Sequence, residues 1–189
     1  MKLLAISGSA RRDSTNTALL MAMKELAPEG IVMSVFHRLD TLPVFSPDAE
    51  GELTPPDVLR FLALLADADG VIISSPEYVR SIPGGLKNAI EWMVSRFEII
   101  GKPVTLVHAS HRGDDMLASL RLVLSTVSHG FLDNVFLRLP LLGKTPSEIA
   151  VLMREPAHRA QLLQFLQDFA DAIRASKGND AQAFPLARP

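Results

Sequence analysis

The chain has 189 residues, 48% apolar and 21% charged, which is enough for one sizeable core and typical of a globular protein. Its formal net charge of −2 gives no electrostatic reason to expect nucleic acid or an anionic membrane as a partner. The lack of cysteine excludes disulfides, thiolate catalysis and cysteine-ligated metal sites. The first apolar run, Met1–Ile6, is too short for a signal-peptide core or a membrane span, so we expect a cytoplasmic protein.

Short apolar runs alternate with longer amphipathic segments along the chain. The runs expected to form buried strands are Leu3–Ile6, Ile31–Phe36, Gly70–Ser75, Pro103–Val107 and Asn134–Arg138. Apolar residues at helical spacing predict helices at about residues 15–27, 54–65, 86–97, 117–127 and 162–173. Five strands that alternate with five helices predict an α/β fold, a doubly wound parallel sheet covered by helices on both faces.

Smaller features set the expected limits of these elements. Thr54 is a good N-cap for the second helix, with the prolines after it in the first turn. The long stretch Asp40–Leu53 is expected to be a loop, either merely solvated or functional. We expect one domain over residues 1–176 and a flexible tail over residues 177–189.

The loop after the first strand, Ser7–Thr17, combines hydroxyls, an amide and two guanidinium groups at a predicted helix N-terminus. Free N–H groups and positive potential at a helix start suit a phosphate. The candidate phosphate ligands are Ser9, Arg11 (or Arg12), Ser14, Asn16 and Thr17. The alternative is that Asp13 or Ser14 only caps the helix, which would explain one of these residues.

Two common phosphate-binding patterns are missing from this loop. It is not G-x-G-x-x-G, the fingerprint of dinucleotide binding, and it is not G-x-x-x-x-G-K-[ST], the loop that binds nucleoside triphosphates. The remaining interpretation is a cradle for a monophosphate.

The loop after the third strand begins the segment Ser74–Trp92, in which two prolines and two glycines stiffen a turn. Ligands of open α/β sheets bind beyond the carboxyl ends of the strands, so we expect site roles for Glu77, Tyr78 and Arg80. Farther along this segment, Trp92 is expected in the core. Lys87 and Glu91 are four residues apart and are consistent with a surface pair.

The loop after the fourth strand, His108–Asp115, is expected to face the same cleft. Ser110 and Gly113 are candidates for backbone approach to a ligand. His111 is equally consistent with an exposed loop position and with a functional one. We find no metal-ligand spacing in the sequence and no order of residues that supports a Ser-His-Asp triad.

These motifs resemble those of the NADPH-dependent FMN reductase family of flavodoxin-like proteins, which includes quinone and chromate reductases. The matching blocks are Gly8-Ser9-x-Arg11-x-x-Ser14-x-Asn16, Leu42-Pro43-x-Phe45-x-Pro47-Asp48, Pro76-Glu77-Tyr78, Ser81-Ile82-Pro83-Gly84 and Leu86-Lys87-Asn88-Ala89-Ile90-Glu91-Trp92. The resemblance spans about residues 2–173 and implies a flavodoxin-like sheet with strand order 2-1-3-4-5.

The resemblance also implies a cofactor and its contacts. It assigns the FMN phosphate to Ser9, Arg11, Ser14, Asn16 and Thr17, and the flavin ring to Pro76, Glu77, Tyr78, Val79, Ser110 and Gly113. The candidates for contact with nicotinamide or the acceptor are Arg80, His111 and Arg112. NADPH or NADH would reduce the flavin, a quinone or free flavin would accept the electrons, and no side chain would act as a catalytic acid or base. The family usually forms homodimers or homotetramers.

Two departures from the family pattern affect the ring end of the expected site. Val79-Arg80 replaces the usual Asn-Gly, and His111-Arg112-Gly113 replaces a common Pro-Gly-Gly. Val79-Arg80 keeps open a non-catalytic protein that has kept the fold. A flavodoxin-type electron carrier is a further alternative, against which the net charge of −2 counts, since such carriers tend to be strongly acidic.

Overall fold

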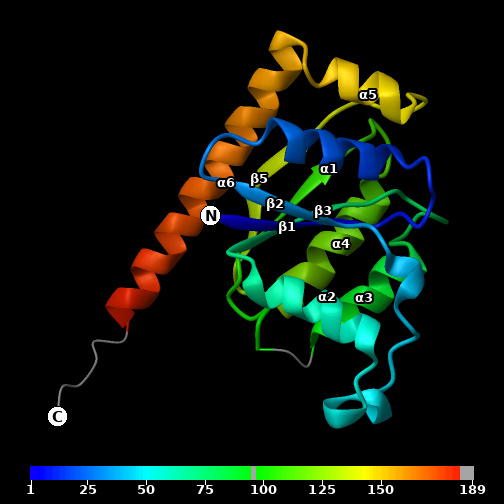
Figure 1. Ribbon diagram of the computed structural model, residues 1–189, viewed down its shortest axis with the longest axis vertical. Coiled ribbons are helices and arrows are strands. Elements are labelled where there is room, and N and C mark those ends of the chain that lie inside the picture. Colours follow the sequence, from blue (N-terminus) through cyan, green and yellow to red (C-terminus); the bar gives the residue numbers. More distant parts are fainter. Residues whose placement is uncertain (95–96, 184–189) are drawn as a thin grey trace.

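A computed structural model describes residues 1–94 and 97–183. Its centre is one parallel sheet of five strands in the order β2-β1-β3-β4-β5 (Figure 1). The strands are β1 (Lys2–Ser7), β2 (Val32–Phe36), β3 (Gly70–Ser74), β4 (Val104–His108) and β5 (Phe131–Arg138). The predicted fold class and strand order are confirmed.

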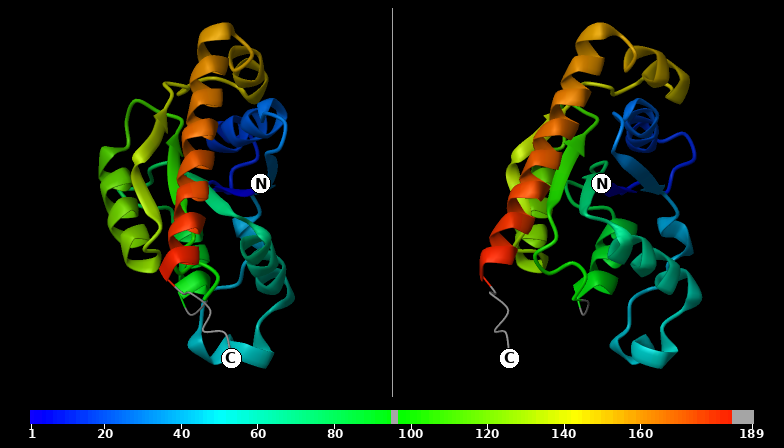
Figure 2. Two further views of the ribbon diagram at one scale, coloured as in Figure 1. Left: turned by 90° about the vertical axis from the view of Figure 1, so that its left-hand side faces the viewer. Right: turned by 60° about the vertical axis from the view of Figure 1, so that its left-hand side comes forward.

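Helices cover both faces of the sheet (Figures 1 and 2). One layer consists of α1 (Thr15–Leu26), α5 (Pro146–Leu152) and α6 (Pro156–Ala183), and the other of α2 (Pro56–Asp67), α3 (Gly84–Val94) and α4 (Asp114–Val127). Strand side chains alternate between the two cores: Leu3 packs with the first layer, and Leu4 packs with the second. Trp92 is 2% exposed in the second core, as predicted.

Parallel pairing places the ends of the central strands side by side. Ser7 of β1 is in register with Ser74 of β3, which is in register with Val107 of β4. The three loops that follow these strands therefore leave the same edge of the sheet, where ligands of open α/β folds bind.

Two predicted helix features are wrong, and one short helix is not predicted at all. Thr54 does not cap α2, because its hydroxyl donates to the carbonyl of Gly51 while Pro55 occupies the N-cap. Phe97 does not continue the apolar face of α3; it is 88% exposed in a turn after the helix. The short helix α5 was missed, although Thr145 and Glu148 form a capping box at its start.

The bounds of other predicted elements also differ from those in the structure. β5 begins at Phe131, three residues before the predicted start. The loop Asp40–Leu53 contains the turns η1 (Leu39–Thr41), η2 (Pro47–Ala49) and η3 (Gly51–Leu53). The expected tail begins inside α6, which continues to Ala183, and residues 184–189 lie outside the described residues. No helix in the described part of the chain combines the length and the apolar character needed to span a membrane.

Candidate functional site

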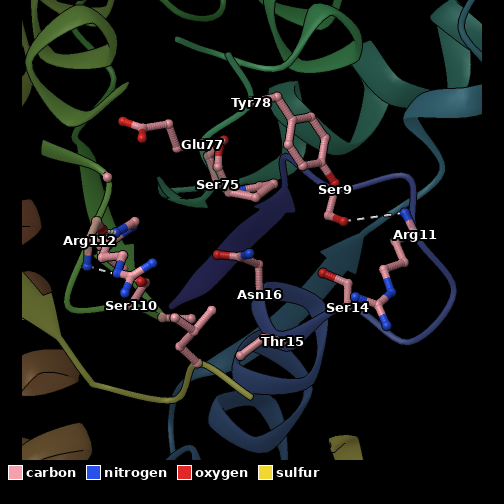
Figure 3. A pocket seen from close by; sticks show the side chains of 15 residues that line it. Ser9, Arg11, Ser14, Thr15, Asn16, Ser75, Glu77, Tyr78, Ser110 and Arg112 are labelled. Carbon is pink, nitrogen blue, oxygen red and sulfur yellow. Dashed lines mark hydrogen bonds between the residues drawn. The ribbon is translucent and has the colours of Figure 1, made fainter. Parts of the chain in front are cut away.

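A pocket of about 340 Å³ lies at the carboxyl edge of the sheet, between the loops that follow β1, β3 and β4 (Figure 3). The β1 loop contributes Ser9, Arg11 and Ser14, and the first turn of α1 contributes Thr15 and Asn16. The ends of β3 and β4 and the loops that follow them contribute Ser75, Pro76, Glu77, Tyr78, His108, Ala109, Ser110, Arg112 and Gly113. Leu142, beyond β5, completes the wall. Figure 3 shows Arg11 and Ser14 on one side of the pocket and Ser110 and Arg112 on the other.

The end of the pocket beside α1 presents hydrogen-bond donors. Ser9, Ser14 and Asn16 are 3%, 4% and 8% exposed, yet all three line the pocket. Ser74 donates its hydroxyl to Oδ1 of Asn16 at 2.9 Å, which leaves the Nδ2 group of Asn16 available to a ligand. Arg11 adds a cation, and none of the described residues that line this end of the pocket is acidic. Such a donor set suits a phosphate.

Ser14 both caps α1 and lines the pocket. Its hydroxyl accepts a hydrogen bond from the Thr17 backbone N–H at 3.3 Å and caps α1. Thr17 lies away from the pocket, and its own hydroxyl is 2.8 Å from that of Ser7. Thr15 lines the pocket instead. Successive residues of an α-helix are rotated by about 100° about its axis, so the side chains of residues 15 and 17 face different directions.

The turn after β3 keeps an unusual backbone. Val79 and Arg80 have φ values of 50° and 57°, and reciprocal backbone hydrogen bonds of 3.0 and 3.2 Å join Tyr78 to Ser81. Positive φ at both central residues defines a type I′ turn, which favours Asn-Gly. The Asn-Gly of the family is replaced, but the turn it would form is retained. Val79 is 99% exposed, and neither it nor Arg80 lines the pocket.

Replacement of the two turn residues should stabilise the protein. A β-branched side chain at positive φ is strained, at a cost on the order of 1–3 kcal/mol for each such residue. We expect Val79→Asn to raise the free energy of unfolding by about 1 kcal/mol, and Val79→Asn with Arg80→Gly by about 2 kcal/mol. Urea denaturation measures the change. The matched control, Val44→Asn, alters another exposed valine, whose φ is not positive, and should have almost no effect.

Side chains join the loops after β3 and β4. Glu77 accepts a hydrogen bond from the backbone N–H of Met116 at 3.0 Å, so this pocket residue also caps the first turn of α4. Arg80 pairs with Asp115 at 2.5 Å on the exposed rim. The positions of the two loops are therefore coupled at the mouth of the pocket.

Contacts with β5 hold the loop after β4 in place. Arg138 donates to the Ser110 carbonyl at 2.9 Å and pairs with Asp114 at 2.8 Å. Gly113 has a φ of 100°, and a Cβ there would lie 2.9 Å from Nε2 of His108. Glycine is needed here for both conformation and space. Gly113, Ser110 and Arg112 line the pocket as predicted from their loop, while His111 is exposed outside it.

His108 is the pocket residue whose importance the sequence least revealed. Its side chain is 2% exposed, and Nε2 lies in hydrogen-bond contact with the carbonyl of Arg112. Burial is the main cause that lowers its pKa below the usual 6.5; Arg138 lowers it further, and the Arg112 carbonyl partly opposes both. The neutral imidazole therefore supports the loop. Ser75, Ala109, Thr15 and Leu142 are the other wall residues that the sequence prediction left out.

We expect the lowered pKa of His108 to contribute to the loss of protein stability in acid. Because its folded pKa is lowered, the unfolded chain binds this proton first as the pH falls through the ordinary value of about 6.5. The stabilisation is present above that pH and is lost progressively below it. We expect His108→Asn to reduce the difference in unfolding free energy between pH 7.5 and pH 5, whereas His129→Asn, at an exposed histidine, should leave it unchanged. An equal pH dependence in both variants would contradict this account.

Comparison with known proteins finds relatives of this chain by both sequence and fold. The profile of the NADPH-dependent FMN reductase family matches residues 1–137. A 2-hydroxy-1,4-benzoquinone reductase from a Burkholderia species is 43% identical over 93 residues, which cover 49% of this chain and 49% of that protein. A quinone reductase from Escherichia coli K12 is 34% identical over 117 residues, or 60% of this chain and 61% of that protein.

This chain thus matches about half to three fifths of the length of those relatives. Among solved structures, the flavoenzyme NAD(P)H:(acceptor) oxidoreductase FerB from Paracoccus denitrificans superposes with a TM-score of 0.72. The superposition covers 93% of this chain and 98% of that one at 24% identity. At that identity, the likeness shows a shared fold.

Proposed function

This chain belongs to the NADPH-dependent FMN reductase family, and we propose that it uses FMN to pass electrons from a reduced nicotinamide to a small acceptor. The observation that carries the proposal is the pocket at the edge of the sheet. It joins a donor-rich end beside α1 to a wall from two other loops that mixes apolar residues such as Pro76 and Ala109 with polar ones such as Tyr78 and Ser110. That combination fits a molecule with a phosphate at one end and a planar ring at the other.

The residues present suit each part of FMN. Ser9, Arg11, Ser14 and Asn16 would hold the phosphate, with Thr15 beside them. The backbone of the segments 75–78 and 109–113 would orient the ring, with the first segment held by the hydrogen bond from Met116 to Glu77 and the second by the hydrogen bond from Arg138 to the Ser110 carbonyl. When bound, FMN supplies the two-electron chemistry that no side chain of the protein provides.

Arg112 is the residue best placed to influence the ring. It lines the pocket and is exposed, and it makes no ion pair with a described residue. A cation at this position would favour negative charge on the reduced ring or attract the phosphates of the nicotinamide substrate. Arg80 and His111 would then act at the rim rather than against the ring.

We propose a quinone as the acceptor, since the relatives include quinone reductases, with free flavin as a second substrate. We also propose a homodimer or homotetramer. Exposed apolar side chains in the turn after α3 and on α4 support association, among them Phe97, Ile100 and Leu122. Light scattering tests the oligomeric state, and cell fractionation tests the proposed cytoplasmic location.

Steady-state oxidation of NADPH and NADH by the FMN-loaded protein tests the proposed activity, with a benzoquinone or free FMN as the acceptor. We expect turnover that saturates in both substrates. A protein that binds FMN but shows no turnover with either acceptor would overturn the reductase proposal. Rapid exchange of electrons with a protein partner would then indicate the electron-carrier alternative.

A further inference from the structure

Tyr78, the one tyrosine of the chain, lines the pocket from the turn after β3. Resemblance to the FMN reductase family assigns this residue to the flavin ring. Figure 3 instead shows its side chain extending away from Ser110 and Arg112, toward the side of the pocket where Ser9 lies. The phenol therefore points to the phosphate end of the site, while the backbone of Tyr78 stays in the segment that would orient the ring.

The loops after β1 and β3 touch at the base of this end of the pocket. The backbone N–H of Gly8 donates to the carbonyl of Ser74 at 2.7 Å, and a Cβ at position 8 would lie 2.6 Å from Oγ of Ser75. Ser9 directly follows this contact in one loop, and Tyr78 comes three residues after Ser75 in the other. The contact thus brings the start of the β1 loop beside the turn that carries Tyr78.

The backbone of Tyr78 is held by that turn, and its hydroxyl is available to a ligand. Tyr78 donates its N–H to the carbonyl of Ser81 at 3.2 Å, and Ser81 donates its N–H to the carbonyl of Tyr78 at 3.0 Å. The side chain is half-exposed, and its hydroxyl makes no hydrogen bond with a described residue. A phenol in this state can donate its O–H to a bound molecule.

The other candidate phosphate ligands approach from one side only. They belong to the β1 loop and the first turn of α1, and they are Ser9, Arg11, Ser14 and Asn16. A phosphate monoester presents three strongly accepting oxygens, so a donor from a second loop can serve an oxygen that faces away from α1. A hydrogen bond from a phenol to such an anionic oxygen is charge-assisted.

From these features we propose that the Tyr78 hydroxyl donates a hydrogen bond to the ligand phosphate and closes the cradle from the β3 side. The inference rests on the proposed function, because FMN supplies that phosphate. It moves the Tyr78 side chain from the ring to the phosphate. It also makes Tyr78 the one phosphate ligand whose backbone belongs to a segment that would orient the ring, so that phosphate binding would help to hold that segment in place.

Titration of flavin-free protein with FMN and riboflavin tests the inference, since these ligands differ only in the phosphate. The variant is Tyr78→Phe, which removes the hydroxyl alone. We expect it to weaken FMN binding about tenfold, as for loss of one charge-assisted hydrogen bond, and to leave riboflavin binding unchanged. The matched control, Ser110→Ala, removes a hydroxyl from the opposite side of the pocket and should leave the ratio of the two affinities as in the parent protein. An unchanged ratio in Tyr78→Phe would overturn the inference.

A second measurement needs no flavin. Because Tyr78 is the only tyrosine, protein labelled with 3-fluorotyrosine gives one fluorine NMR resonance, which reports on this side chain. We expect inorganic phosphate to shift the resonance in a saturable manner, and chloride at the same ionic strength to leave it in place. A resonance that phosphate does not move, whether or not riboflavin moves it, would overturn the inference. Neither measurement involves turnover, so a protein that binds phosphate through Tyr78 but reduces no acceptor would count against the proposed function alone.

Discussion

An Asn16→Asp variant should lose FMN while keeping its fold. Ser74 donates to Oδ1 of Asn16, and an aspartate oxygen can accept that hydrogen bond equally well. The substitution replaces only the Nδ2 donor, which faces the pocket, with a second carboxylate oxygen. Because this places negative charge against a phosphate, we expect the FMN dissociation constant to rise about 100-fold, or ~2.7 kcal/mol. Fluorescence titration of FMN measures it.

The control for this variant is Asn134→Asp, the same chemical change at an exposed position of β5. It should leave FMN affinity unchanged. The unfolding free energies of both variants, measured without flavin, should stay close to that of the parent protein. FMN affinity in Asn16→Asp equal to that of the parent would mean that the phosphate does not lie at Asn16.

A Gly8→Ala variant should be destabilised and should bind FMN poorly. A Cβ at position 8 would lie 2.6 Å from Oγ and 2.9 Å from Cβ of Ser75, and 2.9 Å from a methyl group of Leu86. The backbone N–H of Gly8 also donates to the carbonyl of Ser74 at 2.7 Å, so the loop cannot move away without losing this bond. Overpacking of this kind lowers the unfolding free energy by about 1–3 kcal/mol. Chemical denaturation measures the loss.

Gly84→Ala is the matched control for that variant. Gly84 begins α3, and a Cβ there meets no atom within 4 Å. Alanine is a better helix former than glycine, so the control should be neutral or slightly stabilising. If Gly8→Ala unfolds at the same denaturant concentration as the parent, the close approach of the β1 and β3 loops is not a constraint on the fold.

Much of the fold could be predicted because it is encoded locally. Each buried strand is a short apolar run, and the alternation with amphipathic segments is sufficient to predict a parallel sheet. The missed helix α5 is short, and its apolar face is too brief to show a period, although Thr145 and Glu148 mark its start. The prediction for Thr54 is wrong because its hydroxyl donates a hydrogen bond to the nearby carbonyl of Gly51 and does not cap the helix.

The candidate site was predictable to the extent that its residues lie close together in sequence. Ser9, Arg11, Ser14 and Asn16 belong to the β1 loop and the first turn of α1, and all line the pocket. Leu142 comes from a segment far along the chain, and only the folded sheet brings it to this wall.

Two further parts of the site depend on contacts that no sequence motif records. The type I′ turn at Val79 and Arg80 could not be foreseen, since neither residue favours positive φ. Nor does the sequence indicate that His108, buried at the pocket wall, makes hydrogen-bond contact with the carbonyl of Arg112.

The most direct test of the account compares FMN with riboflavin, which has the same ring but no phosphate. The donors at the α1 end of the pocket would bind the phosphate of FMN and find no counterpart in riboflavin, and charge-assisted hydrogen bonds contribute about 1.5–3 kcal/mol each. We therefore predict that the parent protein binds FMN at least about 100-fold more tightly than riboflavin, and that Asn16→Asp removes most of this preference. Equal affinity of the parent protein for FMN and riboflavin would contradict the phosphate cradle and the function built on it.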